Sequence, residues 1–318
     1  MLNLLLVLNH RCNFSCSYCL CKKESISISY KAAVLAIDVY FEAHRSKKDY
    51  FVKFCGGEPL LDYGLLKRII FYSRKKADRF GKKVLFQVST NASLLDAKKI
   101  IFFRNSKDIE LFISLDGKES TQKKNRIYNK KIGSFRNILD HRLSLISSPK
   151  IHINMVIAPN KSHVLFENFL FIVRMGFRKI NFLPAYFVVW SSKEAKALQE
   201  QFTKIAIFLK KKGQASKIHI VNCDTSGYMP LINTGIIVDC NGDVFLNNIF
   251  LLNHFSKFRD SLKVGNILAA HFDKILHCGF SRIDSLMKQH LSPDIYQSTY
   301  RVDNVLTEFV YNLNNEKS

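Results

Sequence analysis

The sequence lacks the segments that would export a protein or anchor it in a membrane. No apolar run among its 318 residues reaches the roughly 18 residues that a membrane span requires. The first apolar run, Leu4–Leu8, has only the length of a core strand, and it lacks the basic flank and the small-residue cleavage site of a signal peptide. Internal repeats and low-complexity linkers are absent as well. We therefore expect a globular chain located in the cytoplasm.

Acidic residues are scarce relative to basic ones. The chain holds 26 Asp and Glu against 48 Lys and Arg, which gives a formal net charge of +22. Such a field attracts nucleic acid, an acidic peptide or an anionic membrane surface. The alternative is an ordinary solvated, lysine-rich surface. The sequence shows no RNA-binding motif and no basic tract interleaved with aromatic residues, so it does not favour nucleic acid.

The chain has enough apolar material for a large core, and its cysteines are unevenly distributed. Hydrophobic residues make up 47% of the sequence, which excludes a disordered protein. Four of the 8 cysteines fall within the short stretch Cys12–Cys21. A disulfide framework gives no reason for such crowding, and a cytosolic chain rarely forms disulfides. The cysteines therefore indicate metal or redox chemistry. The ten histidines, by contrast, show no paired metal-binding spacing.

Apolar runs alternate with amphipathic stretches over the first two thirds of the chain. We expect strands at 2–8, 50–55, 83–89, 109–115, 151–157 and 178–183, and helices near 30–46, 63–80, 94–104, 133–147, 162–176 and 191–212. This alternation predicts a parallel sheet, and six such units suit a partial (β/α)6 TIM-like barrel better than a closed one. In these folds chemistry lies at the carboxyl ends of the strands.

The alternation of apolar runs and amphipathic stretches ends after the Lys-rich stretch that ends at Gly213. Two short runs, Gly235–Asp239 and Val244–Asn248, are joined at Asn241-Gly242 and predict a hairpin. We expect a helical segment from about residue 268 and a frayed tail from Asn312. The predicted organisation is an α/β domain over 1–213 and a small α+β C-terminal domain over 214–318.

The strongest local signal is the spacing Cys12-x3-Cys16-x2-Cys19. Thiolates are the ligands that iron–sulfur clusters take, and a short irregular loop can fold three of them around one cluster. Three ligands leave one iron open to a cofactor or substrate. A zinc site usually takes four ligands in two separated pairs, so zinc would require Cys21 as a fourth thiol.

This loop resembles the CxxxCxxC motif of radical S-adenosylmethionine (SAM) enzymes, and Tyr18 before the last cysteine fits the motif. The resemblance implies a [4Fe–4S] cluster on the three cysteines, with SAM chelating the open iron. It also implies reductive cleavage of SAM to a 5′-deoxyadenosyl radical that abstracts hydrogen from the substrate. An electron donor such as flavodoxin or ferredoxin would be needed.

Three later segments, each at the end of a predicted strand, resemble the SAM site of the same family. Gly56-Gly57-Glu58-Pro59 matches the GGEP motif that holds the SAM amino group, and glycines allow close backbone approach. Ser89-Thr90-Asn91 resembles a TNG segment, with Ala92 in place of the glycine. Ser114-Leu115-Asp116-Gly117, with Asn125-Arg126 and Gly133-Ser134-Phe135, resembles the stretch of sulfatase and ribosomal-peptide maturases that binds the SAM carboxylate. The residues implied as SAM contacts are Tyr18, Gly56, Gly57, Glu58, Thr90, Asn91, Ser114 and Arg126. For Arg126 the alternative is one more surface cation.

The C-terminal region resembles the SPASM and twitch auxiliary-cluster domains of those maturases. Cys223, eleven residues, Gly235, four residues and Cys240 match their opening pattern, and Asn241-Gly242-Asp243-Val244-Phe245 matches the turn that follows. Asn247 stands where a further cysteine is usual, and the later cysteine-rich run is missing. One auxiliary cluster on Cys223, Cys240 and Cys278, with Asp224, His277 or substrate as fourth ligand, is weighed against a reduced domain without a cluster.

The resemblance implies a radical SAM enzyme that acts on a peptide or protein side chain, most simply a maturase of ribosomally synthesised peptides (RiPPs). An acidic leader peptide would suit the positive charge. Because the first predicted strand begins at residue 2, leader recognition would require a separate protein, if it occurs. Two alternatives stay open: oxidation of a small molecule by an alcohol-dehydrogenase-like radical SAM enzyme, and a non-catalytic relative that binds RNA.

Overall fold

The computed structural model describes residues 3–128, 134–211, 217–224, 234–269 and 280–315. Six parallel strands with the helices that follow them make up the first two thirds of the chain. The strands are β1 (Leu4–Asn9), β3 (Asp49–Gly56), β4 (Lys83–Thr90), β5 (Ile109–Ser114), β7 (Ile151–Ile157) and β8 (Lys179–Pro184). The helices are α1 (Tyr30–Ala43), α2 (Tyr63–Arg79), α3 (Ala97–Asn105), α4 (Glu119–Asn125), α5 (Ser134–Asp140), α6 (Arg142–Ile146), α7 (Leu165–Arg174) and α8 (Ser192–Leu209).

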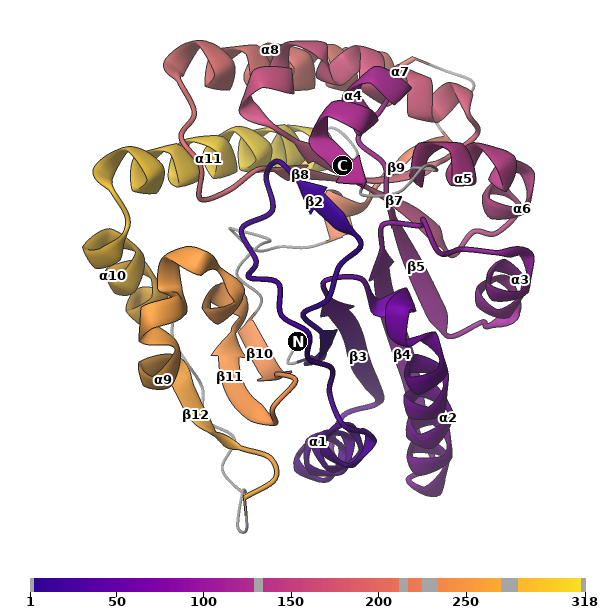
Figure 1. Ribbon diagram of the computed structural model, residues 1–318. Coiled ribbons are helices and arrows are strands. Elements are labelled where there is room, and N and C mark those ends of the chain that lie inside the picture. Colours follow the sequence, from indigo (N-terminus) through magenta and orange to yellow (C-terminus); the bar gives the residue numbers. More distant parts are fainter. Residues whose placement is uncertain (1–2, 129–133, 212–216, 225–233, 270–279, 316–318) are drawn as a thin grey trace.

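The sheet is open, and its strands curve around a central space, as Figure 1 shows. Its order is β12-β11-β10-β1-β3-β4-β5-β7-β8-β9, with β9 (His219–Ile220) at one edge and β12 (Lys263–Asn266) at the other. The predicted partial barrel is therefore confirmed, with eight parallel strands from β10 to β9 and no closure between the two edges among the described strands. The carboxyl ends of β1, β3, β4 and β5 lie at the same end of the sheet, where the sequence motifs follow.

Strand residues alternate between two environments. On β3 the even-numbered Tyr50, Val52 and Phe54 are buried, whereas the odd-numbered Phe51, Lys53 and Cys55 are partly accessible. Because successive side chains of a strand point to opposite faces, the buried set packs under the outer helices and the other set faces the inside of the curve. The inner face is thus available to line a site.

Side-chain caps fix where several helices begin. Ser29 accepts a hydrogen bond from the Ala32 N–H at the start of α1, and Asp96 accepts from the Lys99 N–H at the start of α3. Ser191 and Glu194 form a reciprocal capping box at the start of α8. Each cap satisfies N–H groups that the first turn leaves unpaired.

The C-terminal third extends the same sheet. The hairpin of β10 (Thr234–Val238) and β11 (Asp243–Asn247) is where the sequence predicts one, and β10 pairs in parallel with β1. One sheet therefore contains strands from both sides of the predicted boundary at 213, and the division into 1–213 and 214–318 stays a prediction. Helix α9 (Arg259–Leu262) precedes β12.

Two C-terminal helices follow, α10 (Phe280–His290) and α11 (Pro293–Asn315). Helix α11 packs back on the barrel, where Phe309 stacks on Phe202 of α8 with ring centroids 4.5 Å apart. The prediction of a frayed tail from Asn312 is wrong up to Asn315, because these residues continue α11. The start of the helical segment predicted from about residue 268 falls on residues outside the described part, and α10 is described from Phe280 onward. Within the described residues, no helix is both long and apolar enough to cross a membrane.

Candidate active site

The cysteine loop, defined here as residues 10–21, follows β1 and contains a short strand that the sequence did not predict. Strand β2 (Phe14–Cys16) pairs antiparallel with β6 (Arg126–Tyr128), with Cys16 opposite Arg126. In Figure 1 the indigo segment that carries β2 lies in the middle of the view, in front of the sheet. The pairing fixes the second cysteine of the motif beside a buried cation.

The three cysteines of the motif, Cys12, Cys16 and Cys19, lie together on this loop as free thiols. Burial raises the pKa of Cys12 and raises the pKa of Cys16 to about 11. A hydrogen bond with the Cys21 thiol, helped by the Cys21 N–H and by the charges of Lys23 and Arg126, lowers the pKa of Cys19 to about 6. Three thiols on one irregular loop, with one already inclined to be a thiolate, fit the donor set of an iron–sulfur cluster.

The two glycines of the GGEP segment are required by close backbone contacts with the end of β1 and the start of the cysteine loop. A Cβ atom on Gly56 would lie 2.2 Å from the Asn9 carbonyl oxygen, and one on Gly57 would lie 2.0 Å from that of Arg11. Gly56 also has a φ of +142°, which side-chain-bearing residues rarely adopt. The Gly57 N–H donates to Asn9 (2.9 Å) and the Glu58 N–H to Arg11 (2.8 Å). The glycines therefore let two backbone segments meet.

Glu58 is fully buried and joins the ends of β3 and β4. Its carboxylate accepts hydrogen bonds from the Leu60 N–H (3.0 Å), the Thr90 hydroxyl (2.7 Å) and the Asn91 N–H (2.7 Å). Burial raises the pKa of Glu58, and these donors oppose that rise. A carboxylate offers about four acceptor positions, so Oε2 retains capacity for one more donor such as an ammonium.

The segment after β4 keeps the backbone of a glycine although it holds an alanine. Ala92 has a φ of +64°, and the preceding Asn91 donates from its amide to Asn13 of the cysteine loop at 2.9 Å. The conformation thus matches the resemblance to a TNG segment even though the residue does not. Asn91 lies beside Cys12, with its amide nitrogen 4.0 Å from the sulfur.

Asp116 is a buried hub to which the sequence analysis assigned no role. Its carboxylate receives two bonds from Arg126 (Nη2 at 2.9 Å and Nε at 3.2 Å), one from the Tyr18 hydroxyl (2.6 Å) and one from the Val156 N–H (3.1 Å). The side chains of Arg126 and Asp116 are 6% and 0% exposed, so Arg126 is not a surface cation. Its carboxylate neighbour raises the pKa of Arg126 further, against the effect of burial. The acidic residue following Ser114 in the motif was the available signal.

Ser114 ends β5, pairs with Asn154 of β7, and its carbonyl accepts from Gln122 at 3.3 Å. The Arg126 guanidinium lies over the Tyr18 ring, 5.4 Å from the centroid of that ring. Tyr18, Asp116 and Arg126 therefore form one connected group beside Cys16. The structure therefore brings Tyr18, Glu58, Asn91 and Arg126 around the cysteine loop. Gly133, named with this stretch, lies outside the described residues.

A cavity of about 270 Å³ opens from the cysteine loop into the inner face of the sheet. Cys12 and Cys19 line it together with Gly56 and Gly57, and strands β1, β3 and β4 supply its floor. Lys53 of β3 is among the lining residues, and sequence reasoning missed it. The alternation of residues along the predicted strand could have indicated it, because Lys53 has an odd-numbered place in β3, on the same face as Phe51 and Cys55.

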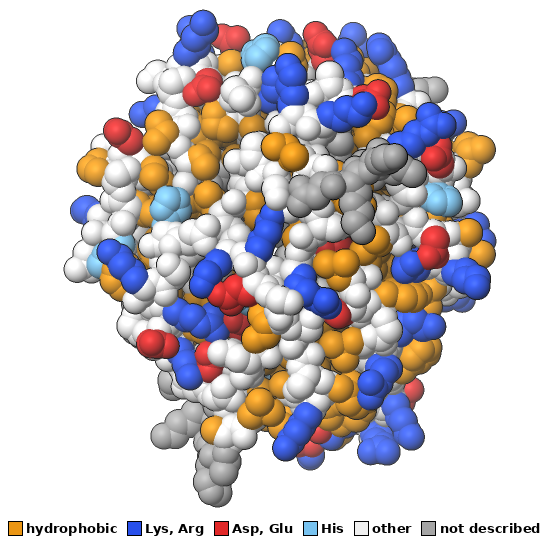
Figure 2. Space-filling view, in the orientation of Figure 1, with side chains coloured by type: hydrophobic (Ala, Val, Ile, Leu, Met, Phe, Trp, Pro, Cys, Tyr) orange, Lys and Arg blue, Asp and Glu red, His pale blue; other side chains and the backbone are white. Residues whose placement is uncertain are grey.

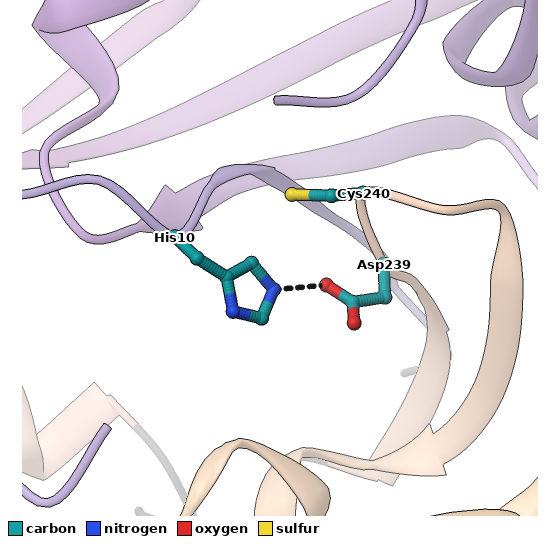
Figure 3. Close-up of side chains that lie close together, drawn as sticks. All are labelled: His10, Asp239 and Cys240. Carbon is teal, nitrogen blue, oxygen red and sulfur yellow. Dashed lines mark hydrogen bonds and ion pairs between the residues drawn. The ribbon is translucent and has the colours of Figure 1, made fainter. Parts of the chain in front are cut away.

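A second group of possible metal donors lies beside the loop, as Figure 3 shows. The ligand atoms of His10, Asp239 and Cys240 lie within 4.8 Å of one another. His10 contacts Asp239 at 2.6 Å, Arg259 contacts the other carboxylate oxygen at 2.7 Å, and the Cys240 thiol donates to the Val7 carbonyl at 3.3 Å. Both carboxylate oxygens are thus paired with basic side chains, and the group ties the C-terminal hairpin to the cysteine loop.

The predicted auxiliary ligands are not brought together by any described contact. Cys223 lies in the 3-10 turn Val221–Asp224 after β9, whereas Cys240 follows β10. Six strands separate β9 from β10 in the sheet order. Cys278 and His277 lie outside the described residues.

Basic side chains are spread over the face shown in Figure 2, interspersed with acidic and uncharged ones. No single dominant stripe is visible on this face. The surface there matches the lysine-rich solvated alternative.

Comparison with known proteins identifies a family over the segment that carries the motifs. The model of the radical SAM superfamily matches residues 6–161. An uncharacterized protein of Methanocaldococcus jannaschii is 33% identical over 121 residues, which span 37% of this chain and 40% of that relative.

The fold is similar to solved structures over nearly the whole chain. The structure described as native anSMEcpe with bound AdoMet has a TM-score of 0.77 at 16% identity, with 100% of both chains covered. Streptococcus suis SuiB bound to S-adenosylmethionine has a TM-score of 0.59 at 14% identity, covering 86% of this chain and 62% of SuiB. At these identities the likeness shows the fold alone. The family itself is shown over residues 6–161, the segment that holds the cysteine loop and the GGEP motif, and this segment matches the radical SAM superfamily.

Proposed function

We propose that this protein is a radical SAM enzyme that modifies a peptide or protein side chain, as a maturase of ribosomally synthesised peptides. Cys12, Cys16 and Cys19 would hold the [4Fe–4S] cluster. The cluster and SAM, when bound, supply a 5′-deoxyadenosyl radical that abstracts a hydrogen atom from the substrate. The protein's part is to hold both groups, to exclude water and to aim the substrate.

The observation that carries the proposal is the shared cavity. Two of the cluster cysteines and both GGEP glycines line the same space, and that space continues onto the inner face of β3 and β4. A ligand bound at the loop therefore faces a substrate held inside the barrel, with helices covering the outer side of the sheet. Such an enclosed arrangement limits quenching of a reactive species by water.

The SAM contacts follow from the residues around the loop. The backbone of Gly56-Gly57, which lines the cavity, and the remaining acceptor position of Glu58 suit the ammonium of SAM. Asn91 donates its N–H to Glu58 and would be a further SAM contact. Ser114 and Arg126 suit its carboxylate. The Nε and Nη2 groups of Arg126 already donate hydrogen bonds to Asp116. Its contact with SAM would therefore use Nη1, which donates to no described residue. Tyr18 and Asp116 would hold this guanidinium in place.

The substrate class rests on the fold likeness and on charge. The anSMEcpe structures include one with bound AdoMet and the Cp18Cys peptide, and Streptococcus suis SuiB is known bound to precursor peptide SuiA. A net charge of +22 favours an acidic partner such as a leader peptide. Recognition of that leader by a separate protein and electron supply by a flavodoxin or ferredoxin complete the proposal.

A second iron–sulfur cluster on Cys223, Cys240 and Cys278 remains part of the proposal as its least supported element. Cys240 is buried with its thiol toward the Val7 carbonyl, and burial raises its pKa strongly. Ligation there would require that hydrogen bond to be broken and the proton to leave.

The test is co-expression of this protein with a short peptide encoded beside its gene, followed by mass spectrometry of the peptide. We expect a mass change that disappears with Cys12→Ala. A peptide of unchanged mass, together with SAM cleavage stimulated by a small alcohol, would replace the peptide assignment with the small-molecule alternative. Absence of 5′-deoxyadenosine from reduced, reconstituted protein would refute radical chemistry altogether.

A further inference from the structure

Three polar side chains on the inner face of the barrel have no task in the chemistry described above. Lys53 of β3 and Gln87 of β4 are direct neighbours in the sheet register, and Ser89 lies two residues further along β4. All three line the cavity that opens at the cysteine loop. None of the three side chains forms a hydrogen bond or ion pair with another described residue.

The Lys53 ammonium is the most unusual of the three. Burial lowers its pKa, and the group opposing that shift is the Cys55 thiol. Burial also raises the pKa of Cys55 to about 12, so near neutral pH this thiol carries no compensating charge. A cation held out of bulk water without a partner is unfavourable, and such groups concentrate at functional sites.

The other charges at this cavity are already committed. Lys22 pairs with Glu24 at 2.5 Å, and Lys23 donates to the Phe14 carbonyl and to the Ser15 hydroxyl at 3.2 Å. Among the described residues, those that line the cavity include no aspartate or glutamate. An anion that neutralises Lys53 must therefore arrive with a ligand.

The SAM carboxylate is not the expected partner of Lys53. Its proposed contacts, Ser114 and Arg126, belong to β5 and β6 and do not line this cavity. Lys53 also lies three residues before Gly56 on β3, which places its backbone roughly 10 Å further into the barrel at the usual strand rise. This depth corresponds to the substrate side of the site.

We propose that Lys53, Gln87 and Ser89 form a carboxylate-binding subsite for the substrate. The ammonium, the side-chain amide and the hydroxyl can donate to the two oxygens of one carboxylate, and the charge-assisted bond supplies most of the affinity. The carboxylate is that of an aspartate or glutamate side chain or of a peptide C-terminus. The inference rests on the proposed function for its peptide substrate, whereas the anion preference of the subsite does not depend on turnover.

Three small probes distinguish the sources of the carboxylate. N-acetylglutamate amide (Ac-Glu-NH2) presents a side-chain carboxylate, N-acetylglutamine (Ac-Gln-OH) presents a C-terminal one, and N-acetylglutamine amide (Ac-Gln-NH2) presents neither. Calorimetric titration of the reconstituted full-length protein should give about tenfold or greater preference for one carboxylate probe over the neutral one, as one charge-assisted hydrogen bond allows. The preferred probe names the source.

Lys53→Met keeps the apolar stem and removes the charge. We expect it to abolish the preference for the carboxylate probe and to leave the thermal unfolding midpoint of the ligand-free protein equal or higher, because a buried unpaired charge is gone. Gln87→Leu should weaken the preference without abolishing it. The matched control is Lys83→Met, an exposed lysine at the start of β4, which should change neither quantity.

The proposal is overturned if wild-type protein shows no preference for either carboxylate probe, or if Lys53→Met keeps the preference. Equal losses in Lys53→Met and Lys83→Met would also overturn it, since net charge would then explain the binding. With the encoded peptide, Lys53→Met should raise KM about tenfold or more while SAM cleavage without peptide persists. If the wild type modifies no peptide but the probes discriminate, the proposed function fails and the carboxylate subsite stands.

Discussion

Replacing Asp116 by asparagine tests the buried hub behind the cysteine loop. The change keeps the shape of the side chain but removes the negative charge that faces Arg126. Both side chains are almost fully buried, at 0% and 6% exposure, so water cannot take over the lost interaction. The variant would leave a buried guanidinium without its counter-charge.

The expected cost is large. Removing one partner of a buried ion pair typically destabilises a protein by about 3–5 kcal/mol. Asp116 also accepts from Tyr18 and from the Val156 N–H, and an asparagine oxygen can retain only part of this set. We therefore expect Asp116→Asn to lower the free energy of unfolding by about 3–5 kcal/mol, a substantial share of the roughly 5–15 kcal/mol that stabilises a typical domain.

Urea unfolding of the anaerobically purified, cluster-free protein measures this quantity. Trp190 is the single tryptophan and is buried, with its indole N–H donating to the Ala185 carbonyl at 2.8 Å, so its fluorescence reports loss of the core. The control is Asp108→Asn, which breaks the Arg74–Asp108 pair whose side chains are 27% and 26% exposed. Because that pair is partly solvated, we expect a loss of about 1 kcal/mol or less.

A loss below about 1 kcal/mol for Asp116→Asn, or a loss no larger than that of the control, would refute the claim that the buried Asp116–Arg126 pair stabilises the fold. A comparable denaturant slope in both variants is needed for the comparison, because a changed slope would mean that the unfolding transition itself had changed.

Three further predictions concern the loop, the glycines and the C-terminal helix. Reconstituted wild-type protein should bind about four irons and cleave SAM, and a variant with all three cluster cysteines replaced should bind none; about eight and four irons would instead establish a second cluster. Gly57→Ala should prevent cluster loading, because its Cβ would lie 2.0 Å from the Arg11 carbonyl oxygen, whereas Gly64→Ala, with nothing within 4 Å, should load normally. Phe309→Ala should lower the free energy of unfolding by about 3–5 kcal/mol, and Tyr311→Ala, 64% exposed, by less than about 0.5 kcal/mol in the same urea assay.

Most of the fold was readable from the sequence because each strand is a short apolar run between longer amphipathic stretches. All six predicted barrel strands overlap observed ones, and the predicted hairpin is in place one residue earlier than expected. Strands β2 and β6 were missed because each has only three residues, too few to show the alternation of apolar and polar residues that marks a strand. Their pairing also depends on a contact between segments more than 100 residues apart. Such contacts have no local signature.

In the candidate site, too, local features could be predicted from the sequence, and features that depend on tertiary contacts could not. Cysteine spacing identifies the three thiols as a possible cluster set, since ligand type and spacing are local properties. For Asp116 and Lys53 the sequence offered only a weak signal, because the ion pair of Asp116 and the place of Lys53 beside Gln87 depend on burial and on neighbours on other strands. The SAM contact of Gly56 and Gly57 stays a prediction, and their close approach to the Asn9 and Arg11 carbonyl oxygens depends on a segment distant in sequence, which the sequence could not reveal.

The pairing of β1 with β10 has a consequence for how the chain is made. Leu4 lies beside Ile236, so β1 gains this neighbour only after the 232 residues that separate the two positions (236 − 4) have been synthesised. Until then one edge of β1 presents unpaired backbone groups next to the cysteine loop, and such edges invite pairing with other chains. Contacts so distant in sequence also slow folding. Slower elongation through the last third should therefore lengthen exposure of that edge, and the yield of folded protein should depend on how quickly the C-terminal hairpin arrives.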